Sequence, residues 1–224
     1  PAFVAIAPTI SNQFWVKCLA LYPRNELLKD QLKEAISAAR RIRPALQAAG
    51  RRALAVAALY GDVPNKPRDV IAGHRPWKQV NLRGQRAYEC PFLRCPVCDA
   101  HMCWTEADLN ASRETLHCMA TSCGAVLDSH EIRLTRTRMR KEPPDILFTS
   151  TEMLNKRMGD SLFRGLFGVG LAPERRPFLF LLDEVHTYDS VHGAHVALLL
   201  RRWKRASEAR PHFVGLSATL ADAP

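Results

Sequence analysis

The stretch Phe178-Leu-Phe-Leu-Leu-Asp183-Glu184-Val-His186 is an apolar run that ends abruptly in two carboxylates and an imidazole. Such a run is typical of a parallel strand that is buried on both faces and therefore shows no polar alternation. In open parallel sheets, ligands bind beyond the carboxyl ends of the strands, which is where this sequence places its acids. The stretch predicts a parallel α/β sheet with a polar site at its rim.

Other apolar runs along the chain alternate with helix-like segments. Strands are predicted at residues 16–22, 53–59, 145–148, 177–182 and 212–216, and helices at 25–50, 152–158 and 190–205. Pro44 is expected to end or kink the first helix. Residues 62–90 are rich in Pro, Gly, Arg and Lys without a period, which predicts a connecting loop. Because strands alternate with helices, we expect helices on both faces of the sheet.

The composition favours a polyanionic partner. The chain has 224 residues, enough for one domain with an insertion, and its 32 Lys and Arg against 22 Asp and Glu give a formal net charge of +10. This excess favours nucleic acid, although a solvated basic surface gives the same count. No apolar run approaches the ~18 residues of a membrane span, and no signal-peptide pattern opens the chain. We therefore expect a cytoplasmic protein with no membrane partner.

The acids at the end of the 177–182 strand have the chemistry of a phosphate-hydrolysing site. Asp183 is placed to hold Mg²⁺, directly or through water, and Glu184 to orient or deprotonate the water that attacks a γ-phosphate. Two acids after an apolar strand can also begin an ordinary solvated loop. A second strand end carries the hydroxyls of Ser217 and Thr219. Hydroxyls at a neighbouring strand end can hydrogen-bond the acids and report the nucleotide state.

Together, these two strand ends resemble motifs II and III of the DEAD/DEAH-box branch of superfamily 2 helicases. Leu21 to Gln31 resembles motif Ia and Asp145 to Leu154 resembles motif Ib, and all four stretches occur in the expected order. The resemblance implies a RecA-like domain that hydrolyses ATP with Mg²⁺ at Asp183, Glu184, His186, Ser217 and Thr219. It also implies contacts to the nucleic-acid backbone, with DNA as the expected partner, from Arg24, Asn25, Gln31, Thr149, Thr151 and Glu152.

The helix that follows the acids resembles one particular branch of this helicase family. Residues 186–202 are similar to the branch that contains mitomycin-repair-type helicases and phage-defence helicases of the DISARM-like and DpdJ-like kinds, which implies a role and partners in DNA repair or defence. No Gly-x-x-x-x-Gly-Lys-Ser/Thr loop is present, although this family binds phosphates with that loop. Both ends of the chain are expected to be cuts, with the loop upstream of Pro1 and the second RecA-like domain also missing. This fragment alone is expected to be inactive.

Six of the seven cysteines lie between residues 90 and 123. Cys95 and Cys98 form a Cys-x-x-Cys pair, and Cys118 and Cys123 form a second pair with four residues between its cysteines. Two such pairs can hold one structural Zn²⁺ in a closed tetrahedral site, although the second spacing departs from the usual two residues. Reduced, buried thiols are the alternative. The other candidate ligands are Cys90, Cys103, His101 and His117.

These patterns predict a divided domain. Residues 1–89 are expected to be the first part of the RecA-like domain, 90–130 a zinc-ribbon-like insertion, and 131–224 the second part. The expected function is that of an ATP-dependent DNA helicase or translocase, and the alternative is a non-catalytic, nucleic-acid-binding zinc ribbon on a vestigial motor domain. Two further groups can contact nucleic acid or can be ordinary surface and core: the basic residues Arg133, Arg136, Arg138, Arg140 and Lys141, and the aromatic residues Trp77, Phe92 and Trp104.

Overall fold

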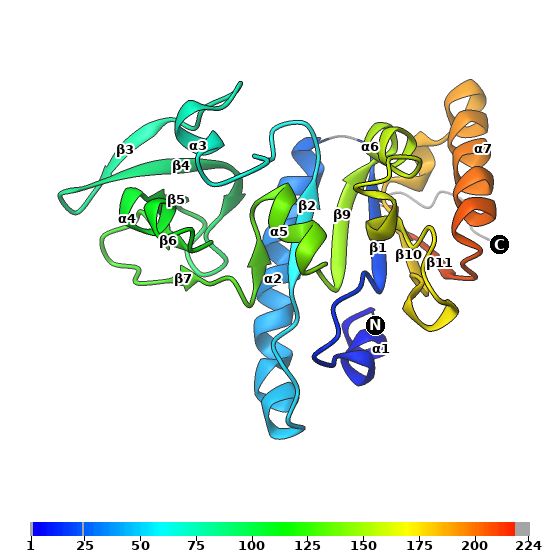
Figure 1. Ribbon diagram of the computed structural model, residues 1–224, viewed down its shortest axis with the longest axis horizontal. Helices are drawn as coiled ribbons and strands as arrows, with labels where there is room; N and C mark the ends of the chain where they lie inside the picture. The colour runs from blue at the N-terminus through cyan, green and yellow to red at the C-terminus, as the bar shows by residue number, and fades with distance from the viewer. Residues whose placement is uncertain (1, 24, 218–224) are drawn as a thin grey trace.

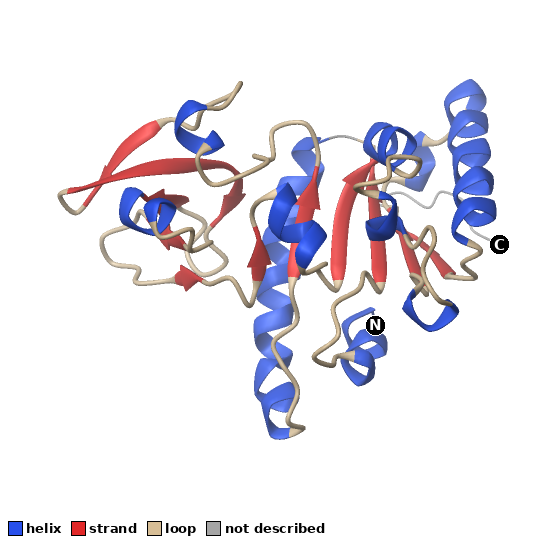
Figure 2. Cartoon of the chain, in the orientation of Figure 1, coloured by secondary structure: helices blue, strands red, loops and turns tan. Residues whose placement is uncertain are grey.

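The computed structural model describes residues 2–23 and 25–217, which form two sheets (Figures 1 and 2). The first sheet contains β1 Cys18–Tyr22, β2 Val56–Leu59, β8 Ile132–Arg133, β9 Ile146–Ser150, β10 Leu179–Leu182 and β11 His212–Gly215. All its pairings are parallel, in the order β11-β10-β1-β9-β2-β8. The predicted parallel α/β sheet is confirmed.

Helices connect these strands and cover the sheet. The α-helices are α1 Ala2–Ile6, α2 Asn25–Ala48, α3 Asp69–Ala72, α4 Glu106–Asn110, α5 Arg136–Lys141, α6 Thr151–Arg157 and α7 Ser190–Ser207. Short 3-10 helices are η1 Ala7–Thr9, η2 Arg164–Phe167, η3 Pro173–Arg175 and η4 Val185–Thr187. In Figure 1, α2 lies behind the sheet, whereas α5 and α6 lie in front of it. Across the described residues, no helix is long and apolar enough to cross a membrane.

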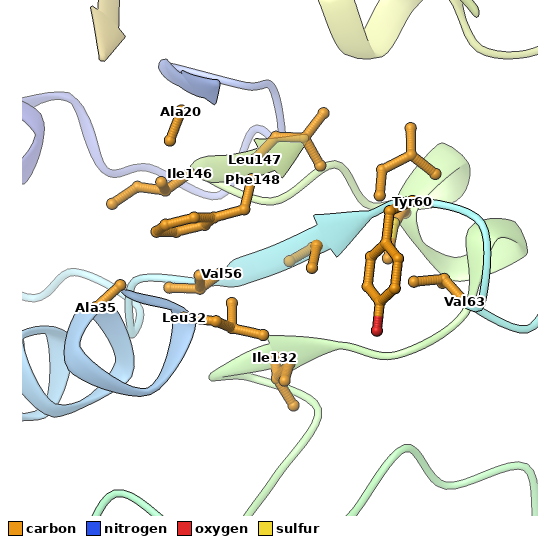
Figure 3. Packing of buried hydrophobic residues seen from close by; sticks show 14 of the residues in the cluster. Ala20, Leu32, Ala35, Val56, Tyr60, Val63, Ile132, Ile146, Leu147 and Phe148 are labelled. Carbon is orange, nitrogen blue, oxygen red and sulfur yellow. The ribbon is translucent and has the colours of Figure 1, made fainter. Parts of the chain in front are cut away.

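The core forms where α2 packs on the central strands. Every residue of β1 and β2 is buried, as expected for strands covered on both faces. Leu32 and Ala35 of α2 point toward Val56 of β2 (Figure 3). Removing such apolar surface from water stabilises the fold by about 25 cal/mol per Å². The sheet is therefore a rigid frame for the side chains at its rim.

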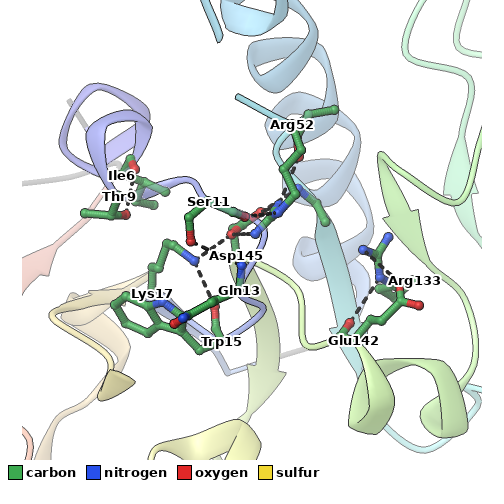
Figure 4. A network of polar contacts seen from close by, with 12 residues as sticks. Ile6, Thr9, Ser11, Gln13, Trp15, Lys17, Arg52, Arg133, Glu142 and Asp145 are labelled. Carbon is green, nitrogen blue, oxygen red and sulfur yellow. Dashed lines mark hydrogen bonds and ion pairs between the residues drawn. The ribbon is translucent and has the colours of Figure 1, made fainter. Parts of the chain in front are cut away.

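A buried ion cluster joins the beginnings of β1 and β9 (Figure 4). Lys17 and Asp145 are both fully buried, and the Lys17 ammonium donates to the Asp145 carboxylate at 2.8 Å. The Arg52 guanidinium donates twice to the same carboxylate, at 2.6 and 2.7 Å, and the Ala55 amide donates at 2.8 Å. The cluster lies at the strand starts, at the opposite edge of the sheet from the predicted site.

The second sheet is antiparallel and lies beyond the β8 edge of the first (Figure 1). Its strands, in spatial order, are β3 Gln79–Leu82, β4 Gln85–Arg94, β5 His101–Thr105, β6 Leu116–Cys118 and β7 Val126–Leu127. The predicted insertion is therefore present, but its sheet begins at Gln79, within the segment 62–90 that the sequence assigned to a loop. That loop prediction is wrong, since the segment holds α3, β3 and the start of β4.

Pro44 does not end the first helix, because α2 continues through it to Ala48. The helix stops just before Gly50, whose φ of +66° is the left-handed conformation that glycine adopts most readily. A proline inside a helix removes one backbone hydrogen bond and crowds the carbonyl of the residue four positions earlier, and the buried apolar face of α2 outweighs that cost.

Candidate nucleotide site and candidate zinc site

The acids lie at the carboxyl-terminal rim of the parallel sheet. Strands β10 and β11 pair with Leu182 opposite Gly215, so Asp183 and Leu216 leave the sheet at the same level. The Asp183 amide donates to the Leu21 carbonyl at 3.1 Å, and the Leu216 amide donates to the Leu182 carbonyl at 2.8 Å. The two strand ends that the sequence singled out are therefore neighbours.

His186 connects these two strand ends. Its Nδ1 lies 2.9 Å from the Ser217 hydroxyl, and its Nε2 lies 3.2 Å from a Glu184 carboxylate oxygen. Glu184 adopts φ 51°, ψ 46°, which turns the chain back so that the Val185 amide donates to the Leu216 carbonyl at 3.0 Å. A residue with a side chain at Gly215 would place its Cβ 3.0 Å from Val185. The Val185 side chain therefore packs closely on the backbone at Gly215.

Asp183 is 9% exposed, and its surroundings disfavour its charge. Burial and the neighbouring Glu184 carboxylate raise the pKa of Asp183 above its ordinary value. Burial, with the Asp183 charge nearby, raises the pKa of Tyr188 to about 12 and also raises that of Tyr22. A bound cation would offset the cost of this buried negative charge. Mg²⁺ is bound in proteins through one or two carboxylates together with water and substrate phosphates, so the Asp183 carboxylate fits a magnesium ion.

The two tyrosines beside Asp183 were missed in the sequence. Tyr22 is the last residue of β1, the strand that pairs with β10, so its position at the end of a predicted strand was an available signal. Tyr188 follows the short turn η4 and offered no such signal. Thr219 lies outside the described residues.

The predicted nucleic-acid contacts fall in three places. Arg24 is outside the described residues, Asn25 is the first residue of α2, and Gln31 is exposed on that helix. Thr149 does not fit the role, because its side chain is fully buried and donates to the Leu59 carbonyl at 3.1 Å. The remaining pair, Thr151 and Glu152, begins α6.

Thr151 and Glu152 line an open groove of about 470 Å³ between α6 and α7. The groove also includes Asn155 and Arg202, whose side chains are hydrogen-bonded at 2.9 Å. Neither Asp183 nor Glu184 lines this groove. The groove is therefore separate from the acids. Both nevertheless lie beyond the same rim of the sheet, because α6 follows β9 and η4 follows β10, and these strands are parallel.

Four cysteines of the second sheet converge as a metal site requires. The Sγ atoms of Cys95, Cys98, Cys118 and Cys123 all lie within 4.8 Å of one another, with closest approaches of 3.4 Å for Cys98 to Cys118 and 3.9 Å for Cys95 to Cys123. A tetrahedral zinc with Zn–S bonds of about 2.3 Å holds its sulfurs about 3.8 Å apart. The four thiols therefore fit one zinc ion, in spite of the longer second spacing.

The other candidate ligands are occupied elsewhere. Burial raises the pKa of Cys90 to about 12 and that of Cys103 to about 11, which keeps both thiols protonated. The Cys103 thiol donates to the His117 carbonyl at 3.6 Å, and the His117 Nε2 contacts Asp108 at 2.8 Å. His101 pairs with Glu89. Among the described residues, the four-cysteine group stands as the candidate site.

Three aromatic residues near the second sheet, and the basic residues that follow this sheet in the chain, were the other candidates for nucleic-acid contact. Trp77, Phe92 and Trp104 are buried and contact one another at ring distances of 5.7 to 6.0 Å, so they pack a core. Arg133 is 2% exposed and donates to the Glu142 carbonyl. The three rings and Arg133 therefore do not offer nucleic acid a surface. Of the remaining basic residues, Arg136, Arg138 and Arg140 are half-buried and Lys141 is exposed.

Comparisons with known proteins relate the chain to helicases. No protein-family model matches it. ATP-dependent helicase hrq1 of Schizosaccharomyces pombe (strain 972 / ATCC 24843) is 34% identical over 82 residues, covering 35% of this chain and 7% of that protein. The structure of Mycobacterium smegmatis helicase Lhr bound to ssDNA and AMP-PNP aligns with a TM-score of 0.53 at 18% identity, over 98% of this chain and 19% of that one. The DUF1998 helicase MrfA aligns with a TM-score of 0.46 at 19% identity, over 92% and 20% of the two chains.

The sequence similarity indicates homology to part of an ATP-dependent helicase, and the likeness to Lhr shows a shared fold. The chain spans only 7% of the length of its curated relative. Activity, substrate and partners are therefore taken up as proposals.

Proposed function

We propose that this chain is part of the first RecA-like domain of an ATP-dependent DNA helicase or translocase of superfamily 2. The observation that carries the proposal is the contact of His186 with both Glu184 and Ser217 beside the buried Asp183. This arrangement joins the predicted catalytic acids to a hydroxyl on the next strand. A change at the bound nucleotide therefore reaches Ser217, in the loop after β11, through the His186 side chain.

Each residue of the site has a chemical role in this proposal. Asp183 holds Mg²⁺, whose charge offsets that of the transferring phosphate. Glu184 orients and deprotonates the attacking water, and His186 fixes the Glu184 carboxylate through its Nε2. Ser217 senses the position of that imidazole through Nδ1. Thr219 belongs to the same predicted motif.

In this proposal, other parts of the helicase lie outside these 224 residues. It requires a phosphate-binding loop, which this sequence does not contain, and a second RecA-like domain that completes the nucleotide site. Asn25, Gln31, Thr151 and Glu152 are proposed to contact the nucleic-acid backbone. The zinc is structural, because four thiolates leave it no open coordination position. We propose a cytoplasmic role in DNA repair or phage defence.

The test is the Glu184→Gln substitution in the full-length protein. Glutamine keeps the shape of the side chain but cannot accept the water's proton, so we expect turnover of ATP to fall by a factor of about 10² to 10⁴. Binding of the magnesium nucleotide should be retained. The matched control is Glu174→Gln, which alters an exposed carboxylate in η3 and should leave turnover unchanged. Equal turnover in both variants would remove Glu184 from the mechanism.

A further inference from the structure

The hairpin formed by β3 and β4 projects to the far end of the molecule from α7 (Figure 1). Its turn has two residues, Arg83 at φ 51° and Gly84 at φ 87°, a combination that matches the right-handed twist of the flanking strands. The Asn81 side chain accepts a hydrogen bond from the Gly84 amide at 2.7 Å, which fixes the turn. We call residues 78–86 the arm. The arm is an ordered two-stranded ribbon.

The arm presents a basic and amide-rich surface. The segment from Arg75 to Tyr88 contains four cationic side chains and no carboxylate. Within the arm, the exposed polar side chains are Lys78, Gln79, Asn81, Arg83, Gln85 and Arg86. Arginine and lysine contact phosphates, and amide side chains bond to base edges, so this surface suits nucleic acid.

Two acids outside the arm are close to its cations, but neither neutralises them strongly. Arg86 lies 3.1 Å from Glu106, and their side chains are 56% and 34% exposed. Lys78 lies 3.9 Å from Glu89, and its own side chain is 80% exposed. Exposed ion pairs of this kind contribute about 0 to 1 kcal/mol. Both cations can therefore exchange their carboxylate for a phosphate.

The arm favours a duplex over a single strand. Proteins that bind single strands stack the bases on exposed aromatic rings, at about 1–3 kcal/mol per base. The aromatic residues near the arm are buried instead: Trp77 is 6% exposed and Tyr88 is 5% exposed. A two-stranded β-ribbon fits the major groove of a duplex, which is about 12 Å wide. The ribbon therefore has the shape for a duplex and lacks the rings for a single strand.

The second sheet is attached to the motor sheet through α2. The Lys33 ammonium donates to Asp99 at 2.8 Å, and the Ser37 hydroxyl donates to the Pro96 carbonyl at 3.3 Å. Arg40 donates to the Val126 carbonyl and pairs with Glu131. Since α2 begins directly after β1, these contacts hold the second sheet and its arm beside the sheet that carries Asp183 and Glu184 at its rim.

We propose that the arm binds the backbone and major groove of duplex nucleic acid next to the motor, through Lys78, Arg83 and Arg86. The proposal rests on the proposed function, since it assigns the duplex part of that substrate to a surface outside the predicted motor motifs. A zinc ion held by the four cysteines would brace the sheet from which the arm extends.

The test compares two triple variants of the zinc-loaded, full-length protein. Lys78→Ala/Arg83→Ala/Arg86→Ala removes three charges from the arm. The control removes three exposed charges from the opposite side of the molecule, in η3 and α7: Arg175→Ala, Arg201→Ala and Arg205→Ala. Binding is measured to a duplex with a single-stranded tail and to the tail alone, over a series of salt concentrations. Zinc content and thermal unfolding show whether each variant is folded.

The arm variant should bind the tailed duplex at least about tenfold more weakly, and the magnitude of its log–log salt slope should fall by about 2.7, or 0.9 for each lost phosphate contact. Affinity for the tail alone should not change, and the control should match the parent protein. An arm variant that binds the tailed duplex as the parent does would overturn the proposal and leave an acidic protein as the partner class. Loss of duplex binding in a protein that turns over no ATP would support the arm and refute the proposed function.

Discussion

The Asp145→Ala substitution should be among the most destabilising single changes in the described part of the chain. The carboxylate accepts four hydrogen bonds: one from Lys17, two from Arg52 and one from the Ala55 amide. Lys17 is fully buried, and its other hydrogen-bond acceptor is the Trp15 carbonyl at 3.2 Å. Removing the carboxylate leaves an uncompensated ammonium inside the protein, which costs about 3–5 kcal/mol.

The assay is equilibrium unfolding in urea, with Lys17→Met as a second variant. Methionine removes the buried ammonium but leaves Asp145 paired with Arg52 and with the Ala55 amide, so the loss should be smaller than for Asp145→Ala. Glu34→Ala is the control, because it removes a carboxylate that is 61% exposed and lies 3.9 Å from Lys33, and it should cost less than about 1 kcal/mol. A loss for Asp145→Ala no larger than that of the control, or a reversed order of the two cluster variants, would refute this reasoning. Should Asp145→Ala fail to fold, Asp145→Asn permits the same comparison.

The same cluster predicts a pH dependence, and the four cysteines predict a metal content. Burial alone would raise the pKa of Asp145, but the Arg52 hydrogen bonds and the Lys17 charge lower it below its ordinary value. The stabilisation is therefore present above about pH 4 and is lost as pH falls through the folded pKa, so the stability gap between the parent and Asp145→Asn should close in acid; a constant gap would contradict this assignment. Metal analysis should find about one zinc per chain, and Cys98→Ala should lower that content and the unfolding temperature together. Metal-free protein with unchanged stability would exclude the zinc site.

The parallel sheet was predictable because its strands are buried on both faces. Such strands appear in the sequence as short, continuous apolar runs, and Pro177–Leu182 and Ala53–Leu59 both proved to contain strands. Strand β8 was missed because it has only two residues, and one of them is the charged Arg133. A strand that short carries no periodic signal.

The second sheet was only partly predictable. The cysteine spacing indicated a metal-bearing unit, but the strands before Cys90 have a different pattern. In β3, Gln79 and Asn81 alternate with the half-buried Val80 and Leu82, and four residues are too few to separate a strand from a loop. The sheet forms because β3 pairs with β4 across a two-residue turn. Composition alone does not reveal this pairing.

The candidate site was predictable in its residues and less so in its contacts. The order of the two strand ends along the chain favoured their proximity, since parallel strands expose their carboxyl ends at one rim. The role of Thr149 was misjudged, because its hydroxyl turns inward to the Leu59 carbonyl. The buried cluster of Lys17, Arg52 and Asp145 was not foreseen, although two of these charges directly precede apolar strands.

A double-mutant cycle between His186 and Ser217 tests most directly whether the two strand ends act as one nucleotide site. ATP turnover by the full-length protein is measured for His186→Ala, for Ser217→Ala and for the pair, with Ser161→Ala in place of Ser217→Ala as the distant control. The hydrogen bond of 2.9 Å predicts a coupling energy of about 1 kcal/mol for the first pair, a factor of about five in turnover, and none for the control. Additive losses at His186 and Ser217, within about 0.3 kcal/mol, would show that the contact has no part in hydrolysis and would contradict the proposed function.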